Sequence, residues 1–172
     1  MSKLEGLTIN GWSLFIHPVF LEQLEFLLKE VKKLRQKDPL TYKKKNSTKR
    51  LAAIAKLIFE VIPNDPTLAA YRQGSTLGHN YSHWHRVKFF QQYRLFFRYH
   101  LGSKVIIYAW VNDEDTKRAY DKKNDAYRVF SKMLQGGRPP DDWSQLLTES
   151  QNIEAITAAT KDLLRQLKSA PL

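Results

Sequence analysis

Three apolar-rich stretches joined by very short connections constrain the fold of this chain more than any other feature. They are His83–Phe90, Tyr93–His100 and Lys104–Asn112, and each has the length and alternation typical of a strand. The connections, Gln91–Gln92 and Leu101–Ser103, are short enough to be hairpin turns. The sequence therefore predicts an antiparallel three-strand meander.

The residues before the meander predict one strand and two helices. Thr8–His17 reads as a strand, and Pro18 is suited to the first position of a helix. Apolar residues then recur at helical spacing as far as Leu34. A second amphipathic helix is expected to start near Ser47 or Thr48 and to stop at Pro63.

The residues after the meander predict two further helices. Asp125–Gln135 fits a short helix, and Arg138–Trp143 fits a rigid turn. Thr148 and Gln151 form a candidate capping box for an amphipathic helix from Ile153 to Leu167. The expected class is α+β, with an antiparallel-rich sheet of about four strands and helices packed on one face.

Length and composition limit the possible classes of protein. We expect one domain over residues 1–147 and a C-terminal helical extension over 148–172. The chain has no cysteine, which excludes disulfides, thiolate metal sites and a cysteine nucleophile. No apolar run approaches the length of a membrane span, and the N-terminus has no secretory pattern, so a soluble cytoplasmic protein is expected.

Basic residues dominate, with a formal net charge of +11. The first basic region, Lys29–Arg50, is interpreted as a solvated face. The second, residues 66–112, is 47 residues long and has no Asp or Glu, while arginines, lysines and aromatic residues alternate along it. Such a pattern is typical of a surface that holds phosphates and stacks bases.

Strand alternation places the cations of this second region on one face of the meander. Arg94 and Arg98 point the same way, and Arg86 and Lys88 join them from the preceding strand, beside Trp84 and Trp110; the apolar sets would pack on the helices. An ordinary solvated outer face is the alternative, but such a face usually mixes both signs of charge. Since buried unpaired cations are costly, the hypothesis requires this face to be open.

Several ordered motifs resemble one known family. They are Tyr71-Arg-Gln-Gly-Ser-Thr-Leu-Gly78, Trp84-His-Arg-Val-Lys-Phe89, Tyr93-Arg-Leu-Phe-Phe-Arg-Tyr99, Ala109-Trp-Val-Asn-Asp-Glu114, Val129-Phe-Ser-Lys-Met-Leu134 and the Pro-Pro turn before Trp143. Together they resemble the YhaV family of bacterial type II toxins, within the RelE/ParE superfamily. The resemblance covers about residues 8–146.

The resemblance implies a RelE-like α+β fold and a ribonuclease that cuts mRNA on the ribosome. It implies neutralisation by a PrlF-type, AbrB-like antitoxin, and repression of the operator DNA by the toxin–antitoxin complex. Neither a metal nor another cofactor is expected.

Candidate site residues follow from matching the motifs to this chain. The candidates for catalysis are Arg86, Lys88, Arg94, Arg98 and Tyr127. The candidates for substrate binding are Arg72, Trp84, Trp110, Asn112, Arg118 and Lys122, with the two tryptophans stacking bases. Arginine suits a phosphate because it can grip two oxygens at once. His83 and His85 are expected to be core or hydrogen-bonded residues.

Two other functions remain compatible with the sequence. One is a non-catalytic basic module that binds nucleic acid through the same face. The other is a gyrase-directed relative that acts by protein–protein contact. The cluster of four cations favours the nuclease over the gyrase-directed protein.

Overall fold

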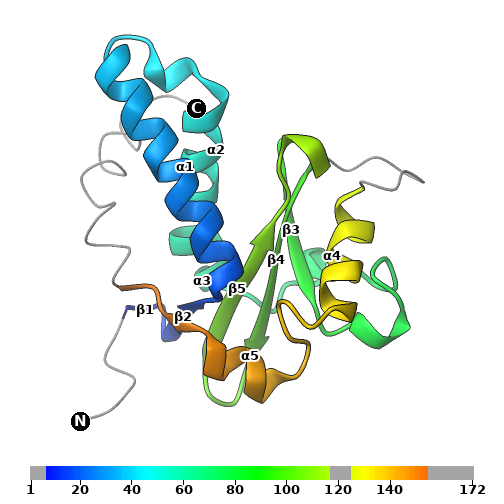
Figure 1. The fold of residues 1–172 in the computed structure, drawn as a ribbon. Coiled ribbons are helices and arrows are strands. Elements are labelled where there is room, and N and C mark those ends of the chain that lie inside the picture. Colours follow the sequence, from blue (N-terminus) through cyan, green and yellow to red (C-terminus); the bar gives the residue numbers. More distant parts are fainter. Residues whose placement is uncertain (1–6, 117–124, 155–172) are drawn as a thin grey trace.

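The computed structural model describes residues 7–116 and 125–154 of the 172-residue chain. Within these ranges the fold is α+β, with a mixed sheet between two groups of helices (Figure 1). The strands are β1 (Thr8–Ile9), β2 (Trp12–Ile16), β3 (His85–Phe89), β4 (Tyr93–His100), β5 (Val105–Val111) and β6 (Gln151–Asn152). The helices are α1 (Pro18–Lys37), α2 (Asn46–Lys56), α3 (Ile62–Asn64), α4 (Ala126–Gln135) and α5 (Trp143–Glu149).

The sheet has the order β1-β2-β5-β4-β3, and β6 pairs with β2. The predicted meander is confirmed, because β3 pairs antiparallel with β4 and β4 pairs antiparallel with β5. The one parallel pair among the described strands joins β2 to β5, and α1 and α2 lie between these strands along the chain. The α+β class and the antiparallel-rich sheet are therefore confirmed.

An irregularity between β4 and β5 changes which way one tryptophan points. Phe96 pairs with Trp110, but its neighbour Phe97 pairs with Tyr108, so Ala109 is an extra residue in β5. Beyond this bulge the alternation shifts by one residue. Trp110 therefore lies on the face of Ile107 rather than on that of Tyr108, which simple alternation along the strand does not predict.

The first helix begins where the sequence indicates. Pro18 is its first residue, and the His17 side chain accepts a hydrogen bond from the Val19 backbone, with Nδ1 at 3.2 Å. His17 is fully buried, and its Nε2 lies 3.0 Å from a carboxylate oxygen of Glu149 in α5. This contact joins the first helix to the last described one.

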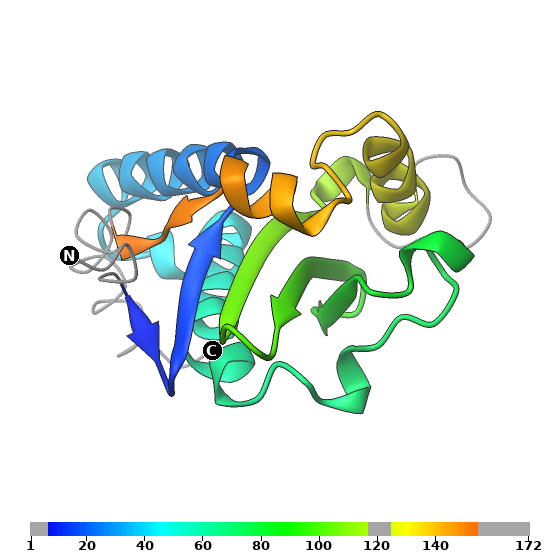
Figure 2. The ribbon, with the colours of Figure 1, turned by 90° about the horizontal axis from the view of Figure 1, so that it is seen from below.

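Helices cover both faces of the sheet, as the view from below makes clear (Figure 2). On one face α1 and α2 pack on β2, β4 and β5 through a core that includes Phe20, Ile54 and Phe97. On the other face α4 and α5 pack on β4 and β5 around Phe96 and Phe130. The expectation that one face stays uncovered is therefore wrong.

The segment after α4 also differs from its prediction. The expected turn is present over residues 138–142, but helix α5 begins at Trp143 itself, capped by the Asp142 side chain, which accepts from the Gln145 backbone. Thr148 lies inside this helix and Gln151 begins β6, so the predicted capping box is wrong. Apart from Ile153 and Glu154, the predicted helix to Leu167 lies outside the described residues.

After β6, Ile153 is fully buried in the core that α1 and α2 form with the sheet. None of the described helices is long and apolar enough to cross a membrane.

Phe130 anchors α4 to the sheet, and its removal is expected to be costly. Its ring is fully buried and stacks on Phe96 and Trp110, with centroids 4.4 and 5.4 Å away. Phe130→Ala is expected to lower the free energy of unfolding by about 3–5 kcal/mol in urea denaturation. Leu101→Ala, at an exposed turn, is the control and should change it by less than about 0.5 kcal/mol. A small effect of Phe130→Ala would show that α4 is not held in this way.

Candidate active site

The four candidate cations share one face of the β3–β4 hairpin, as predicted. Arg86 is paired with Phe96 and Lys88 with Arg94 in the antiparallel register. This is the face on which α4 and α5 pack. The predicted grouping is thus confirmed, but the prediction of an open cationic face is wrong.

A phenol hydroxyl joins two of these cations. The Tyr127 hydroxyl accepts a hydrogen bond from Arg86 Nε at 2.9 Å and one from Arg94 Nε at 3.2 Å. Tyr127 lies in the first turn of α4, where Asp125 caps the helix by accepting from the Tyr127 backbone. Its ring is buried and meets Phe96 edge to face. We call Arg86, Arg94 and Tyr127 the arginine–tyrosine cluster.

Arg94 is the inner member of this cluster. Its side chain is buried, and its Nη1 donates to the backbone carbonyls of Gln91 and Tyr93 at 2.7 and 2.9 Å. The Arg94 backbone donates to the Asn112 amide oxygen at 2.6 Å. These bonds fix the β3–β4 turn, and they leave Arg94 beneath α4 rather than on the surface.

Arg86 is the outer member and is only partly buried. Its Nη1 donates to the Ala70 carbonyl at 2.8 Å, and this contact lies at the surface. Lys88, two residues further along the same face, is exposed. Arg86 and Lys88 therefore both reach solvent on this face of the hairpin.

Arg98 lies at the opposite end of the hairpin and has a different environment. Its guanidinium carbon lies 5.6 Å from the Trp84 ring centre and 5.3 Å from that of Trp143, and its Nη1 donates to the Asp141 carbonyl. Burial lowers the pKa of Arg98, although Asp141 and Asp142 act in the opposite direction. Arg98 is half-buried, as Arg86 is, but the two indole rings cover its guanidinium, and its buried Nε has no acceptor among the described residues.

The two tryptophans and the asparagine expected to touch substrate are structural. Trp84 is 0% exposed and Trp110 is 6% exposed, so the prediction that they stack bases is wrong. Asn112 is fully buried, and its amide donates to the carbonyls of Gln92 and Thr116. Side chains of α4 pack against the aromatic rings of this face, so these rings already have partners within the protein.

The remaining substrate-binding candidates are less constrained. Arg72 is exposed, and its backbone forms an isolated bridge with His85. Arg118 and Lys122 lie outside the described residues. In residues 7–116 and 125–154, no three His, Asp or Glu side chains come together in a way that could hold a metal ion.

The structure gives His83 a partner that the sequence did not indicate. Its Nε2 lies 2.6 Å from Asp141 Oδ1, and the same oxygen accepts from Trp84 Nε1 at 2.8 Å. Because 58 residues separate His83 from Asp141, no local pattern predicts the pair. It ties the turn before α5 to the start of β3. His85 packs on Phe97 and Tyr99, as expected of a core residue.

Comparison with known proteins identifies the relatives of the chain. A family model described as a toxin with endonuclease activity, of a toxin–antitoxin system, and named for the toxin YhaV, matches residues 14–151. A protein named "Toxin YhaV" in Escherichia coli O6:H1 is 50% identical over 145 residues, which is 83% of this chain and 94% of the relative. "Ribonuclease toxin YhaV" of Escherichia coli (strain K12) shows the same identity and coverage. No solved structure gives a significant match.

The environment of His85 predicts a pH dependence of stability. Burial lowers its pKa from 6.5, and the nearby charges of Arg72 and Arg98 act in the same direction. A hydrogen bond between the ring and the His83 backbone raises the pKa but does not outweigh the burial. The unfolded chain therefore binds a proton more readily, so stability should fall as the pH drops below about 6.5. His85→Phe keeps a ring in place and should reduce this fall in urea unfolding at pH 7 and pH 5. His79→Phe, at an exposed histidine, should leave it unchanged. Equal pH dependence in wild type and His85→Phe would contradict this assignment.

Proposed function

The chain belongs to the YhaV family of toxins with endonuclease activity, and on that premise we propose that it cuts mRNA during translation on the ribosome. The ribonuclease name of a relative that is 50% identical supports RNA as the substrate. The net charge of +11 suits a polyanionic substrate. Since ribosomes translate mRNA in the cytoplasm, the protein acts there.

The proposed reaction is a metal-independent attack within the RNA strand. The 2′-hydroxyl loses its proton and attacks the adjacent phosphorus, and the bond to the 5′-oxygen breaks as that oxygen gains a proton. Negative charge increases on the phosphate oxygens in the transition state. A cation held in place beforehand lowers the barrier because it stabilises this charge without reorganising.

The observation that carries the proposal is the anchored, partly exposed guanidinium of Arg86. Its bonds to Tyr127 and to the Ala70 carbonyl use two N–H donors and fix its orientation. A guanidinium has five such donors, so others remain that can grip two phosphate oxygens. Arg86 is therefore the proposed catalytic cation, and exposed Lys88 holds a neighbouring phosphate.

Tyr127 and Arg94 act through Arg86 in this proposal. Tyr127 orients the Arg86 guanidinium, and Arg94 holds Tyr127 and the β3–β4 turn. Both are therefore positioning residues. Arg98 supports the turn before α5 instead, since it is packed between Trp84 and Trp143. Arg72 is proposed to contact RNA, as are Arg118 and Lys122 by resemblance alone.

The family also defines the partner class, because a toxin of a toxin–antitoxin system has an antitoxin. We propose that this antitoxin is of the PrlF type. We further propose that the complex of both proteins represses its own operon. The resemblance in the sequence motifs supports these two points.

Removing the proposed catalytic cation should abolish cleavage without unfolding the protein. Arg86→Ala is expected to slow cleavage of translated mRNA by about 100-fold or more, as measured by primer extension after induction. Arg138→Ala is the matched control, because that arginine is exposed and forms a weak 3.7 Å ion pair with Glu22. Cleavage and growth arrest that persist in Arg86→Ala would remove this residue from the mechanism.

Tyr127→Phe separates positioning from folding. The variant keeps the ring that packs on Phe96 but removes the oxygen that accepts from both arginines. We expect kcat to fall by about tenfold with a smaller change in KM, because a loosened guanidinium mainly loses transition-state contacts. Circular dichroism should match the wild type. An unchanged kcat would show that the hydroxyl has no positioning role.

A further inference from the structure

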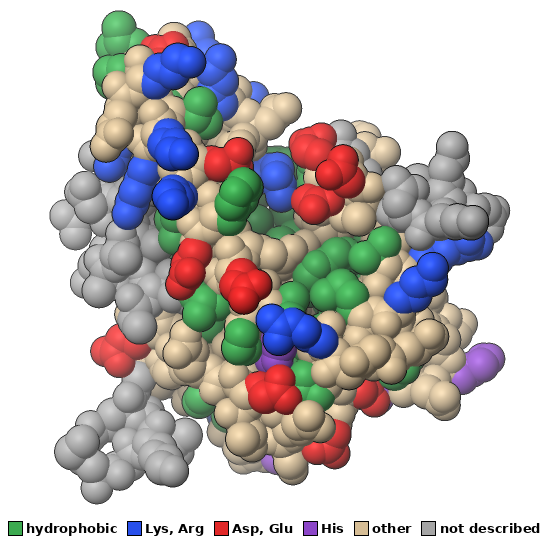
Figure 3. Space-filling view, in the orientation of Figure 1, with side chains coloured by type: hydrophobic (Ala, Val, Ile, Leu, Met, Phe, Trp, Pro, Cys, Tyr) green, Lys and Arg blue, Asp and Glu red, His purple; other side chains and the backbone are tan. Residues whose placement is uncertain are grey.

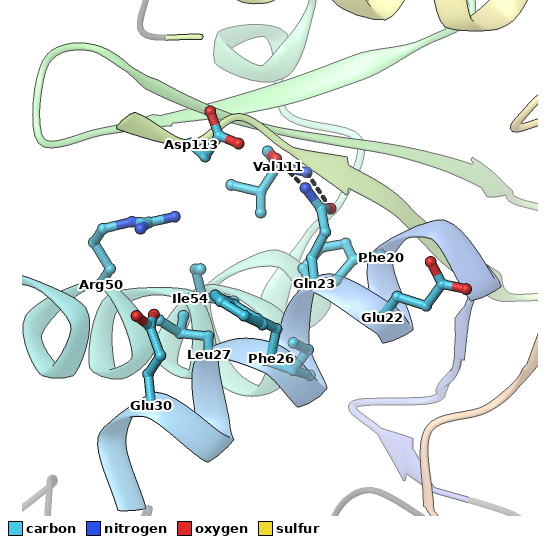
Figure 4. Close-up of a pocket in the computed structure, with 11 residues that line it drawn as sticks. Phe20, Glu22, Gln23, Phe26, Leu27, Glu30, Arg50, Ile54, Val111 and Asp113 are labelled. Atoms are coloured by element: carbon cyan, nitrogen blue, oxygen red, sulfur yellow. Dashed lines mark hydrogen bonds between the residues drawn. The ribbon is translucent and has the colours of Figure 1, made fainter. Parts of the chain in front are cut away.

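A groove on the side of the molecule opposite α4 has no role in the proposed chemistry. Three connected hollows form it. The central one, of about 330 Å³, lies between α1, α2 and the end of β5, and its lining includes Phe26, Leu27 and Arg50 (Figure 4). A second hollow of about 420 Å³ continues along α1 past Phe26. A third, of about 380 Å³, shares Arg50 and reaches Phe90.

Large apolar side chains are exposed in this groove. Phe26 is 66% exposed and Phe90 is 51% exposed, whereas the other large apolar side chains of α1 face the core. Together with the apolar wall of the central hollow, the two rings provide a surface that favours a protein partner.

The charge along the groove is unevenly distributed. Lysines border the hollow along α1 and reach α2, as the blue side chains over these helices in Figure 3 show. They are Lys29, Lys33, Lys37 and Lys49. Two carboxylates, Asp113 and Glu114, lie where the groove meets the end of β5, and Glu22 lies on the nearby start of α1. Glu30 lies further along α1, in the hollow that the lysines border. Because three lysines against one carboxylate line the hollow along α1, an occupant that complements the groove is acidic there.

Arg50 lies where the central and third hollows meet. Its guanidinium carbon stacks 5.0 Å from the Tyr93 ring centre, and its buried Nε has no acceptor within the described part of the chain. A buried donor without a partner is unfavourable. Arg50 lines both hollows, so its guanidinium offers further N–H donors to a carboxylate or carbonyl of an occupant.

We propose that this groove is the docking surface for an acidic, amphipathic segment of the antitoxin. Apolar side chains of the segment cover Phe26 and Phe90, and its carboxylates face the lysines of α1. RNA is a less suitable occupant, because carboxylates line the β5 end of the groove. The proposal does not depend on which residues cut RNA, because Tyr127 packs on the opposite face of the sheet, and Arg86 bonds to it there.

The test compares toxin variants for binding to the purified antitoxin of the same toxin–antitoxin system. All variants carry Arg86→Ala, so that cells tolerate their expression, and their folding is checked by thermal unfolding. Phe26→Asp should weaken antitoxin binding at least tenfold, as loss of an aromatic anchor does. Leu101→Asp is the matched control, because Leu101 is 56% exposed and lies outside the groove; it should bind as tightly as the parent.

A charge-reversal pair provides a second test that is independent of Phe26. Lys33→Glu/Lys37→Glu should weaken binding and reduce its dependence on salt, because charges across an interface attract less when screened. Lys43→Glu/Lys44→Glu makes the same change in net charge at exposed residues outside the hollows and should bind normally.

Cellular assays in the otherwise wild-type toxin distinguish the possible occupants. Phe26→Asp and Lys33→Glu/Lys37→Glu should stop growth even when the antitoxin is co-expressed. Full neutralisation and unchanged binding of both folded variants would overturn the proposal. Loss of mRNA cleavage in folded Lys33→Glu/Lys37→Glu, with antitoxin binding intact, would also overturn it and would assign the groove to RNA.

Discussion

Two guanidinium groups converge on the Tyr127 hydroxyl, and this contact determines how the cationic face of the sheet is used. A buried cation needs hydrogen-bond acceptors, and residues 66–112 contain no carboxylate. The phenol oxygen and backbone carbonyls take that role instead. Arg94 is buried, while Arg86 stays partly exposed at the protein surface with its orientation fixed. The absence of acids from this stretch therefore serves both the fold and the proposed phosphate contact.

Local patterns predicted the parts of the fold that depend on neighbouring residues. The meander follows from strand alternation and two short turns, and α1 begins at Pro18 because proline suits a first helical turn. The second covered face was not predicted, although β5 carries a signal for it. Its residues Val105–Val111 are apolar on both sides, which is typical of a strand buried on both faces.

The candidate site was predicted only in part, because its contacts join distant segments. Alternation correctly placed Arg86, Lys88 and Arg94 together. Strand alternation could not show that α4 buries Trp84 and Trp110, because the packing of a helix on a sheet is not visible as a pattern among neighbouring residues of the sequence. The bulge at Ala109 and the His83–Asp141 pair are likewise visible only in three dimensions. The basic region Lys29–Arg50 was interpreted as a solvated face, yet part of it borders a groove with exposed aromatic rings.

A double-mutant cycle on RNA cleavage tests the central claim, that Tyr127 acts by orienting Arg86. Cleavage rates of wild type, the two single variants Arg86→Ala and Tyr127→Phe, and the double variant are measured on mRNA in a reconstituted translation system. Residues that act as one unit are not additive. The account predicts that Tyr127→Phe slows the wild type but has little further effect once Arg86 is absent. Rate losses that multiply in the double variant would show that the two residues act independently and would contradict the account.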